Sequence, residues 1–549
     1  MTPTIDGLVE RYVATIEKDH PTWASFLGLH ENDDKLGDHS AEGIAQRREH
    51  IEELAGELRT LPDEGMTTDE RIDAALLSST LASALFEHDT VRWHKRRPAS
   101  YLQTALSGCH ILISREFAPL VDRAENLLER LLAVPPLLHH MEENVTAPPK
   151  VFATVGAEVA HGGAQFVRTT IPGVSEKVPA LAEHLDTAAS QAIEAFERSA
   201  AHLEKLAEGA DDAFALGREG FEWLLRNDHM LDLDADQLEE IGRETLDETR
   251  RGLEEIAEDI EPGTSWEELI DRMKNDHPAA GEVRDAYASW MERSRDFIRK
   301  NALVRVPDSE ELEVVDTPVF IRSIIPYAAY MPPGPFETSQ CGQFYVTPVN
   351  EELPPEEQER QLRGHGTYAI PATAVHEGYP GHHLQCVRAN QSDRLLRRLT
   401  WSTVFGEGWA LYCEDMMWEA GFYTDPRIRI FQLKDALWRA ARVVVDVGLH
   451  VRGMTIDEGV DFMVKEAGLE RVNAVAEVKR YAGTPTQPMS YTMGKRTLLD
   501  IRRRRESADR NFKLAAFHNE LLDLGNIPPL LAEVALGLRG PEDVPAWTS

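Results

Sequence analysis

Apolar residues recur at spacings of three and four along most of this chain, with charged residues between them. That spacing places apolar side chains on one face of an α-helix. It predicts helices over residues 41–60, 67–88, 112–134, 181–208, 235–260 and 280–300. Asp234 or Asp236 is suited to cap the helix that follows it. With 549 residues, 42% of them hydrophobic, the chain is long enough for a large core, and we expect a mainly α-helical protein.

The pattern changes between residues 302 and 350, where short runs rich in β-branched residues predict a small sheet. These runs are 303–306, 312–315, 319–322 and 343–348. Pro348 indicates that the last run lies at an edge of the sheet or ends there. Helical spacing returns near Ala372 and continues to the C-terminus. We therefore divide the chain into a helical region 1–300, a small sheet insert 301–350 and a helical region 351–549, which we expect to form one continuous unit.

Charge and cysteine content narrow the classes of partner. The chain carries 58 Lys and Arg against 94 Asp and Glu, a formal net charge of −36. Such an acidic surface repels phosphate and anionic lipid heads, so we expect neither nucleic acid nor membrane partners. The four cysteines form no disulfide framework, the first residues lack a secretory signal, and no uncharged apolar run is long enough to span a membrane. We expect a soluble cytoplasmic protein.

The pair His376-Glu377 begins a candidate metal site. A catalytic zinc needs three protein ligands and one open position for water. Two ligands commonly come from His-Glu-x-x-His on a helix, where a four-residue step puts both imidazoles on one face and the Glu acts as general base. Here Pro380 stands where the second histidine is expected, and the next histidines are His382 and His383.

Neither later histidine can meet His376 at one metal on a regular helix. A step of six turns about 240° away, and a step of seven returns to the same face about 10.5 Å further along the axis. Zinc–nitrogen bonds of about 2.0–2.1 Å cannot span that distance. The segment must therefore leave the helical path, and Pro380 with its flanking glycines provides the means. We favour His382 as the ligand and keep His383 as the alternative.

Glu407 is the candidate third ligand, 25 residues after His382 and on a second predicted helix. Gly406 and Gly408 flank it and would let a neighbouring backbone approach closely. Glu414, seven residues later, is the alternative metal ligand to Glu407. It could instead contact one of the metal-binding side chains without binding the metal itself. A simpler interpretation of all these residues is a histidine-rich helix end that binds no metal.

These residues carry a family resemblance. Residues 376–383 and 407–410 match, position by position, the His-Glu-x-x-Pro-Gly-His-His and Glu-Gly-Trp-Ala patterns of DUF885, a bacterial family of unknown function. Residues 25–30 and 36–40 resemble its N-terminal signature, so the resemblance extends over nearly the whole chain. The family's fold is similar to that of the M32 carboxypeptidases. The resemblance therefore implies a helical zinc-peptidase-like fold with one zinc ion and a deep cleft, which the small sheet would line.

The site residues predict metal-assisted hydrolysis of a peptide substrate. Zinc would polarise the scissile carbonyl, and Glu377 would take a proton from water. Tyr491 is a candidate donor to the oxyanion, a part that tyrosines play in related helical peptidases. A carboxypeptidase and a homodimer are suggested by the resemblance alone. The alternatives are a zinc-binding protein without peptidase activity, because the inserted residues could displace a ligand, and a hydrolase of small amides or esters.

Five further residues are candidates for supporting roles. Arg480 and Lys495 could hold a substrate carboxylate, although surface ion pairing is the simpler interpretation. Tyr345, on a predicted edge strand, could align an extended peptide, and its simpler interpretation is sheet packing. Asp446 and His450 are four residues apart on one helical face. They could fix the orientation of a metal-binding imidazole by hydrogen bonding to it, or they could form an ordinary ion pair between helices.

Overall fold

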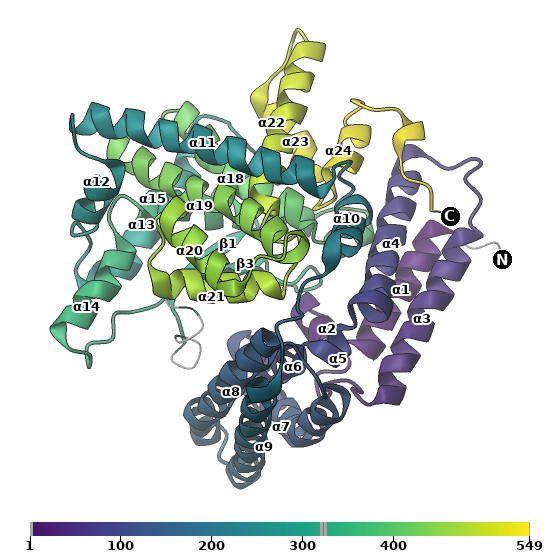
Figure 1. Ribbon diagram of the computed structural model, residues 1–549. Helices are drawn as coiled ribbons and strands as arrows, with labels where there is room; N and C mark the ends of the chain where they lie inside the picture. The colour runs from purple at the N-terminus through teal and green to yellow at the C-terminus, as the bar shows by residue number, and fades with distance from the viewer. Residues whose placement is uncertain (1–3, 319–321, 323–324, 326, 548–549) are drawn as a thin grey trace.

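The alternation of apolar and charged residues gives helices over most of the chain, as the sequence predicts. The computed structural model describes residues 4–318, 322, 325 and 327–547. These residues form a mainly α-helical fold with one small sheet (Figure 1). No helix in this described part of the chain is long and apolar enough to cross a membrane. All four cysteines lie within it and are free thiols.

Three of the first four helices share a hydrophobic core with the C-terminal end of the chain. The four are α1 (Ile5–Asp19), α2 (Pro21–Leu27), α3 (Ala41–Arg59) and α4 (Thr68–Phe86). Thr67 and Glu70 form a capping box that begins α4. Buried residues of α1, α3 and α4 join one hydrophobic core with residues as distant as Trp547. The N-terminal helices are therefore part of the main body.

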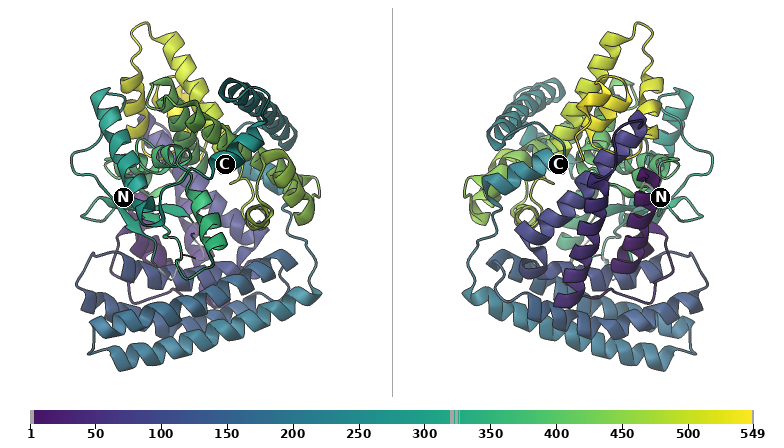
Figure 2. Two further views of the ribbon diagram at one scale, coloured as in Figure 1. Left: turned by 90° about the vertical axis from the view of Figure 1, so that its left-hand side faces the viewer. Right: turned by 90° about the vertical axis from the view of Figure 1, so that its right-hand side faces the viewer.

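The next helices form a layer with its own core. After η1 (Glu87–Val91) and α5 (Trp93–Arg96) come α6 (Pro98–Ser114), α7 (Leu120–Asn144), α8 (Lys150–Lys177) and α9 (Ala182–Gly209). Long helices of this layer run side by side at the bottom of both views in Figure 2. The predicted helix 112–134 is wrong as one element, because α6 ends before Pro119 and α7 begins after it. Proline disfavours helical geometry in the residue before it.

The third group of helices leads to the sheet. It consists of α10 (Gly217–Asn227), α11 (Ala235–Ile260), α12 (Trp266–Met273), η2 (Ala280–Glu282) and α13 (Val283–Lys300). Asp234, one of the two predicted caps, accepts a hydrogen bond from the Gln237 backbone N–H and begins α11. Helix α11 lies alongside α19 (Pro426–Val451) (Figure 1).

The sheet has three strands, β1 (Glu311–Asp316), β2 (Ala328–Met331) and β3 (Cys341–Val346), in the order β1-β3-β2. Strand β3 is central, parallel to β1 and antiparallel to β2. Pro348 therefore marks the end of a strand and not an edge. The predicted strand 303–306 is wrong, because Leu303 closes the end of α13 with a backbone hydrogen bond to Ile298. Of the predicted strand 319–322, residues 319–321 lie outside the described residues.

The C-terminal helices carry the candidate site. They are α14 (Pro355–Leu362), η4 (Arg363–His365), α15 (Ile370–Glu377), α16 (His382–Ala389), α17 (Leu395–Leu399), α18 (Thr403–Glu419), α19, α20 (Ile456–Ala467), α21 (Arg471–Ala482), α22 (Ser490–Ala508), α23 (Leu514–Asp523), α24 (Pro529–Ala535) and η5 (Pro541–Asp543). Helix α18 contacts α15, α16, α19 and α22. Buried residues of β3, α13 and α15 share a small core, so the sheet supports the helix that begins the site.

Candidate metal centre

The helix breaks inside the histidine motif, as the sequence predicts. Helix α15 ends at Glu377 and α16 begins at His382. At Gly381 an added Cβ would lie 1.9 Å from the carbonyl oxygen of His376, so only glycine fits against the end of α15. The indole Nε1 of Trp409 donates a hydrogen bond of 2.8 Å to the Pro380 carbonyl. Helix α18 therefore holds the broken segment in place.

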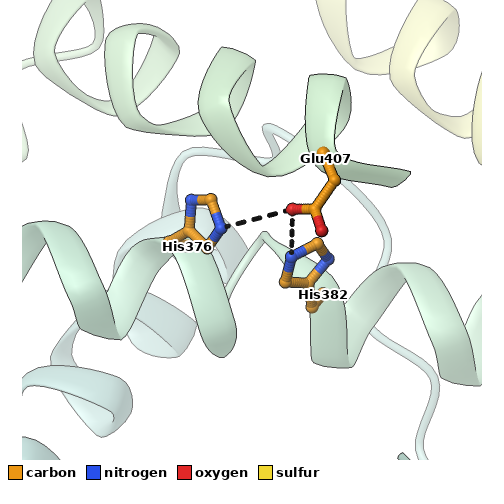
Figure 3. Close-up of side chains that lie close together, drawn as sticks. All are labelled: His376, His382 and Glu407. Carbon is orange, nitrogen blue, oxygen red and sulfur yellow. Dashed lines mark ion pairs between the residues drawn. The ribbon is translucent and has the colours of Figure 1, made fainter. Parts of the chain in front are cut away.

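Three side chains from three helices converge beyond this break (Figure 3). His376, His382 and Glu407 offer ligand atoms that all lie within 4.8 Å of one another. Glu407 Oε2 lies 3.3 Å from His382 Nε2 and 3.9 Å from His376 Nε2. The two imidazole rings are 4.9 Å apart and nearly perpendicular. Two imidazoles and one carboxylate form a donor set that suits zinc.

His383 is directed elsewhere. Its Nε2 lies 2.8 Å from a carboxylate oxygen of Glu310, and its Nδ1 lies 3.0 Å from the Tyr330 hydroxyl. The Tyr379 hydroxyl donates to the same Glu310 carboxylate. Both ring nitrogens of His383 thus have hydrogen-bond partners from the region of the sheet. The structure brings His382, and not His383, to His376.

Glu414 contacts the far side of the His376 ring. Its Oε1 lies 2.8 Å from His376 Nδ1, which leaves His376 Nε2 facing Glu407. Burial lowers the pKa of His376 to about 3, so this imidazole is neutral at physiological pH. A carboxylate on the second nitrogen of a metal-binding histidine is the usual means of fixing its orientation. Glu414 therefore lies where the supporting carboxylate of a metal site would be.

His382 and Glu407 form an ion pair. Burial disfavours the charged form of His382, but the hydrogen bond and charge of Glu407 outweigh it and raise the pKa of His382 to about 9. Burial likewise disfavours the carboxylate of Glu407, but His382, His376 and a hydrogen bond from Tyr491 lower its pKa to about 2. A metal cation at this position would take the place of the His382 proton.

Tyr491 reaches Glu407 because two helices approach very closely. An added Cβ on Gly408 would lie 2.4 Å from the Cα of Gly494, so α18 and α22 touch through their backbones. Gly408 thus has the role that the sequence predicts for it. The Arg442 guanidinium lies 4.5 Å from the centre of the Tyr491 ring. Tyr491 is therefore held directly beside the candidate ligands.

Glu377 follows His376 at the end of α15. Its charge acts to raise the pKa of both His376 and His382, so the carboxylate is close to both rings. It is half-buried and, with His382, lines a cavity of about 320 Å³. A carboxylate between two candidate ligands and an open cavity is placed to act on a water molecule there.

Comparisons with known proteins agree with this arrangement. A family model described as "Bacterial protein of unknown function (DUF885)" matches residues 21–535. The chain belongs to the DUF885 family. No curated protein matches the sequence.

Solved structures share the fold of this DUF885 protein. A protein of unknown function from Shewanella oneidensis, described as a candidate lipoprotein, has a TM-score of 0.78 and 23% identity, over 98% of this chain and all of that one. A candidate lipoprotein from Colwellia psychrerythraea has a TM-score of 0.82 and 19% identity, over 97% of this chain and 99% of that one. At these sequence identities, the similarity shows a shared fold alone.

Two supporting roles predicted for this DUF885 protein need correction. Asp446 accepts a hydrogen bond of 3.2 Å from the Thr486 backbone N–H, and His450 Nε2 lies 3.1 Å from the Tyr481 carbonyl oxygen. Among the described residues, none of their hydrogen bonds reaches a candidate ligand. They contact α21 and the segment that follows it, while Glu414 contacts His376.

The predicted substrate contacts are also differently placed. Arg480 pairs with Glu477 at 2.9 Å, and Lys495 forms an ion pair with Asp415. Both cations already have carboxylate partners. Tyr345 is 2% exposed on the central strand, which pairs on both sides and has no free edge for a peptide. Sheet packing, the simpler interpretation of Tyr345, fits the structure.

Sequence reasoning missed two residues that shape the site. Glu310, just before β1, holds His383 and Tyr379, and nothing in its local sequence signals that role. Trp409 anchors the Pro380 carbonyl, and its place in the Glu-Gly-Trp-Ala pattern was an available signal.

Proposed function

We propose that this protein is a zinc-dependent hydrolase of peptide bonds, with the metal held by His376, His382 and Glu407. The convergence of these three donors within 4.8 Å carries the proposal. Two histidines and one glutamate are the protein ligands in several catalytic zinc sites, where the fourth position is open to water. The contact of Glu414 with His376 Nδ1 supports the fit, because it leaves Nε2 available.

Each residue around the ligands has a task in hydrolysis. A bound zinc ion would polarise the scissile carbonyl and acidify water. Glu377, which lines the cavity, accepts a proton from the attacking water and delivers it to the leaving amine. Tyr491 donates to Glu407 and would turn its hydroxyl to the developing oxyanion. The apolar cavity wall excludes bulk water from this centre.

The substitution Glu377→Gln tests the proposal. It keeps the size of the side chain but removes the base, so zinc content should be unchanged while peptide hydrolysis falls by about 10²- to 10⁴-fold. Zinc is measured by elemental analysis, and hydrolysis is measured with a peptide library before and after chelation. Wild-type activity should disappear with the chelator and return with zinc. Undiminished hydrolysis by the variant would refute the general-base role.

Two other functions are distinguished by the same experiment. A zinc-binding protein without peptidase activity would bind zinc and cleave nothing in the library. A hydrolase of small amides or esters would cleave those substrates, and not peptides, in a chelator-sensitive way. Glu377 favours a hydrolase, because a purely structural zinc site does not need a base beside an open cavity. The cytoplasmic location and the homodimer stay predictions.

A further inference from the structure

The cavity beside Glu377 and His382 has an apolar wall built from distant parts of the chain. Its lining includes apolar side chains from α2, from the turn after β2, from α16 and from the segment between α16 and α18, among them Trp23, Phe26, Pro332, Cys386, Leu399 and Trp401. Its volume of about 320 Å³ is at the lower end of the ~300–1,000 Å³ usual for small-molecule sites. It therefore has room for a large amino-acid side chain next to the reacting centre.

Two tryptophans of this wall are unusually open. Trp23 is 44% exposed and Trp401 is 46% exposed, although both are large apolar residues. Trp23 stacks on Phe26 with ring centres 4.9 Å apart, and the Trp401 ring lies 5.9 Å from that of His382. Exposed aromatic surface gathered around a cavity is typical of a ligand site. The ligand chemistry that fits this wall is an apolar side chain.

Polar side chains interrupt the apolar wall at Asn390, Arg398, Thr400 and Asn526. Arg398 donates through Nε to the Ser392 carbonyl, and no carboxylate in the described parts of the chain pairs with its guanidinium. Asn526 is 1% exposed, and within the described residues neither its amide nitrogen nor its oxygen has a hydrogen-bond partner. Buried polar groups without partners are rare and often mark a site where a ligand supplies them. A guanidinium and a side-chain amide are both suited to bind a carboxylate.

Arg398 differs from the neighbouring arginines, which have carboxylate partners. Arg394, which precedes the short helix α17, and Arg397, within it, both pair with Asp73. Arg480 and Lys495, expected from the sequence to hold a substrate, have carboxylate partners as well. In an acidic chain most cations find such partners. Arg398 is therefore the cation of the cavity that remains available to an anionic ligand.

We infer that this cavity binds the C-terminal residue of a peptide, with its apolar side chain against Trp23 and Trp401 and its free α-carboxylate held by Arg398 and Asn526. The inference rests on the proposed hydrolysis and specifies its substrate. With the α-carboxylate held inside the cavity that Glu377 lines, the bond beside Glu377 is the last peptide bond. Its C–N bond breaks, the hydroxyl of water joins the acyl carbon, and the proton taken by Glu377 goes to the leaving nitrogen. The products are a free apolar amino acid and a shortened peptide.

Matched substrates test this assignment with the zinc-loaded protein. Acetyl-Ala-Phe is compared with its C-terminal amide and with acetyl-Ala-Glu, and kcat/KM is measured for each. The free acid ending in Phe should be preferred over both, and Arg398→Gln should lower its kcat/KM about ten- to a hundredfold, the range of a charge-assisted hydrogen bond. The value for the amide should change little. Arg503→Gln is the control, because the Arg503 side chain is 71% exposed and pairs with Asp500 on the same helix.

A binding measurement separates this inference from the proposed hydrolysis. Acetyl-phenylalanine and its amide are titrated calorimetrically into the Glu377→Gln protein, with and without Arg398→Gln. If the acid binds more tightly than the amide and Arg398→Gln abolishes the difference, the cavity assignment is supported. Failure to hydrolyse any peptide would refute only the proposed hydrolysis and not this assignment. Equal binding of acid and amide, or hydrolysis that prefers the amide or the Glu-ending peptide, would overturn the assignment.

Discussion

Gly381→Ala provides a sharp test of how the broken helix builds the site. The new Cβ would lie 1.9 Å from the His376 carbonyl oxygen and 2.4 Å from that of Val375. Cβ atoms essentially never approach closer than 3.0 Å, so the chain must move by about 1.1 Å. Both obstacles are backbone of α15, and His382 begins α16 directly after the substituted residue. The displacement therefore falls on the distance between His376 and His382.

A shift of this size exceeds what zinc coordination tolerates, since ligand distances vary by only about 0.2 Å. We expect zinc affinity to fall by at least about 100-fold, or roughly 2.7 kcal/mol. Competition with a chromophoric chelator measures the affinity, and circular dichroism checks that the helices persist. Gly366→Ala is the control, because no atom lies within 4 Å of its added Cβ and its φ is −57°. Native zinc affinity in Gly381→Ala would refute the idea that this contact positions His382.

Two further predictions concern the histidines. His383→Gln should leave zinc affinity unchanged but lower the free energy of unfolding by about 1–3 kcal/mol, because Glu310 loses a buried partner. Chelator competition measures the zinc affinity and urea unfolding measures the stability, with His382→Gln as the comparison variant. Loss of zinc binding in the His383 variant would contradict the assignment of His382 as the ligand. Because the pKa of His382 is raised to about 9, this imidazole carries a proton at neutral pH, and zinc must displace it. Apparent zinc affinity should therefore fall about tenfold per pH unit below 9, measured from pH 8 to 6, and a flat profile would show that no such proton is displaced.

The helices could be predicted because their periodicity is local information. Residues 235–260 form a helix with the predicted bounds, and Asp234 caps it. Strand β2 was missed because Ala-Ala-Tyr-Met has no β-branched residue, and it pairs only because β3 lies beside it. Pairing with a distant strand is a tertiary effect that overrides weak local preference.

The metal site was partly predictable for the same reason. Helix geometry alone requires a break between His376 and the later histidines, and the glycines and Pro380 show where it occurs. The sequence favoured His382 over His383 but did not decide between them, because both follow the break. The choice depends on Glu310 and Tyr330, which come from the sheet region and hold His383 away. A local pattern therefore predicts that a site exists, while distant partners decide which side chain enters it.

The substrate contacts show the limit of this reasoning most clearly. A sequence shows where the cations are, but not which carboxylates neutralise them. Lys495 meets Asp415 from another helix, and Arg397 meets Asp73 from the N-terminal region. With 94 acidic residues against 58 basic ones, pairing is the expected fate of any cation in this chain. Within the described residues, Arg398 lines the cavity without a carboxylate partner, and the buried Asn526 amide of the same cavity has no hydrogen-bond partner. These two side chains are thus more informative than any cation near the motif in sequence.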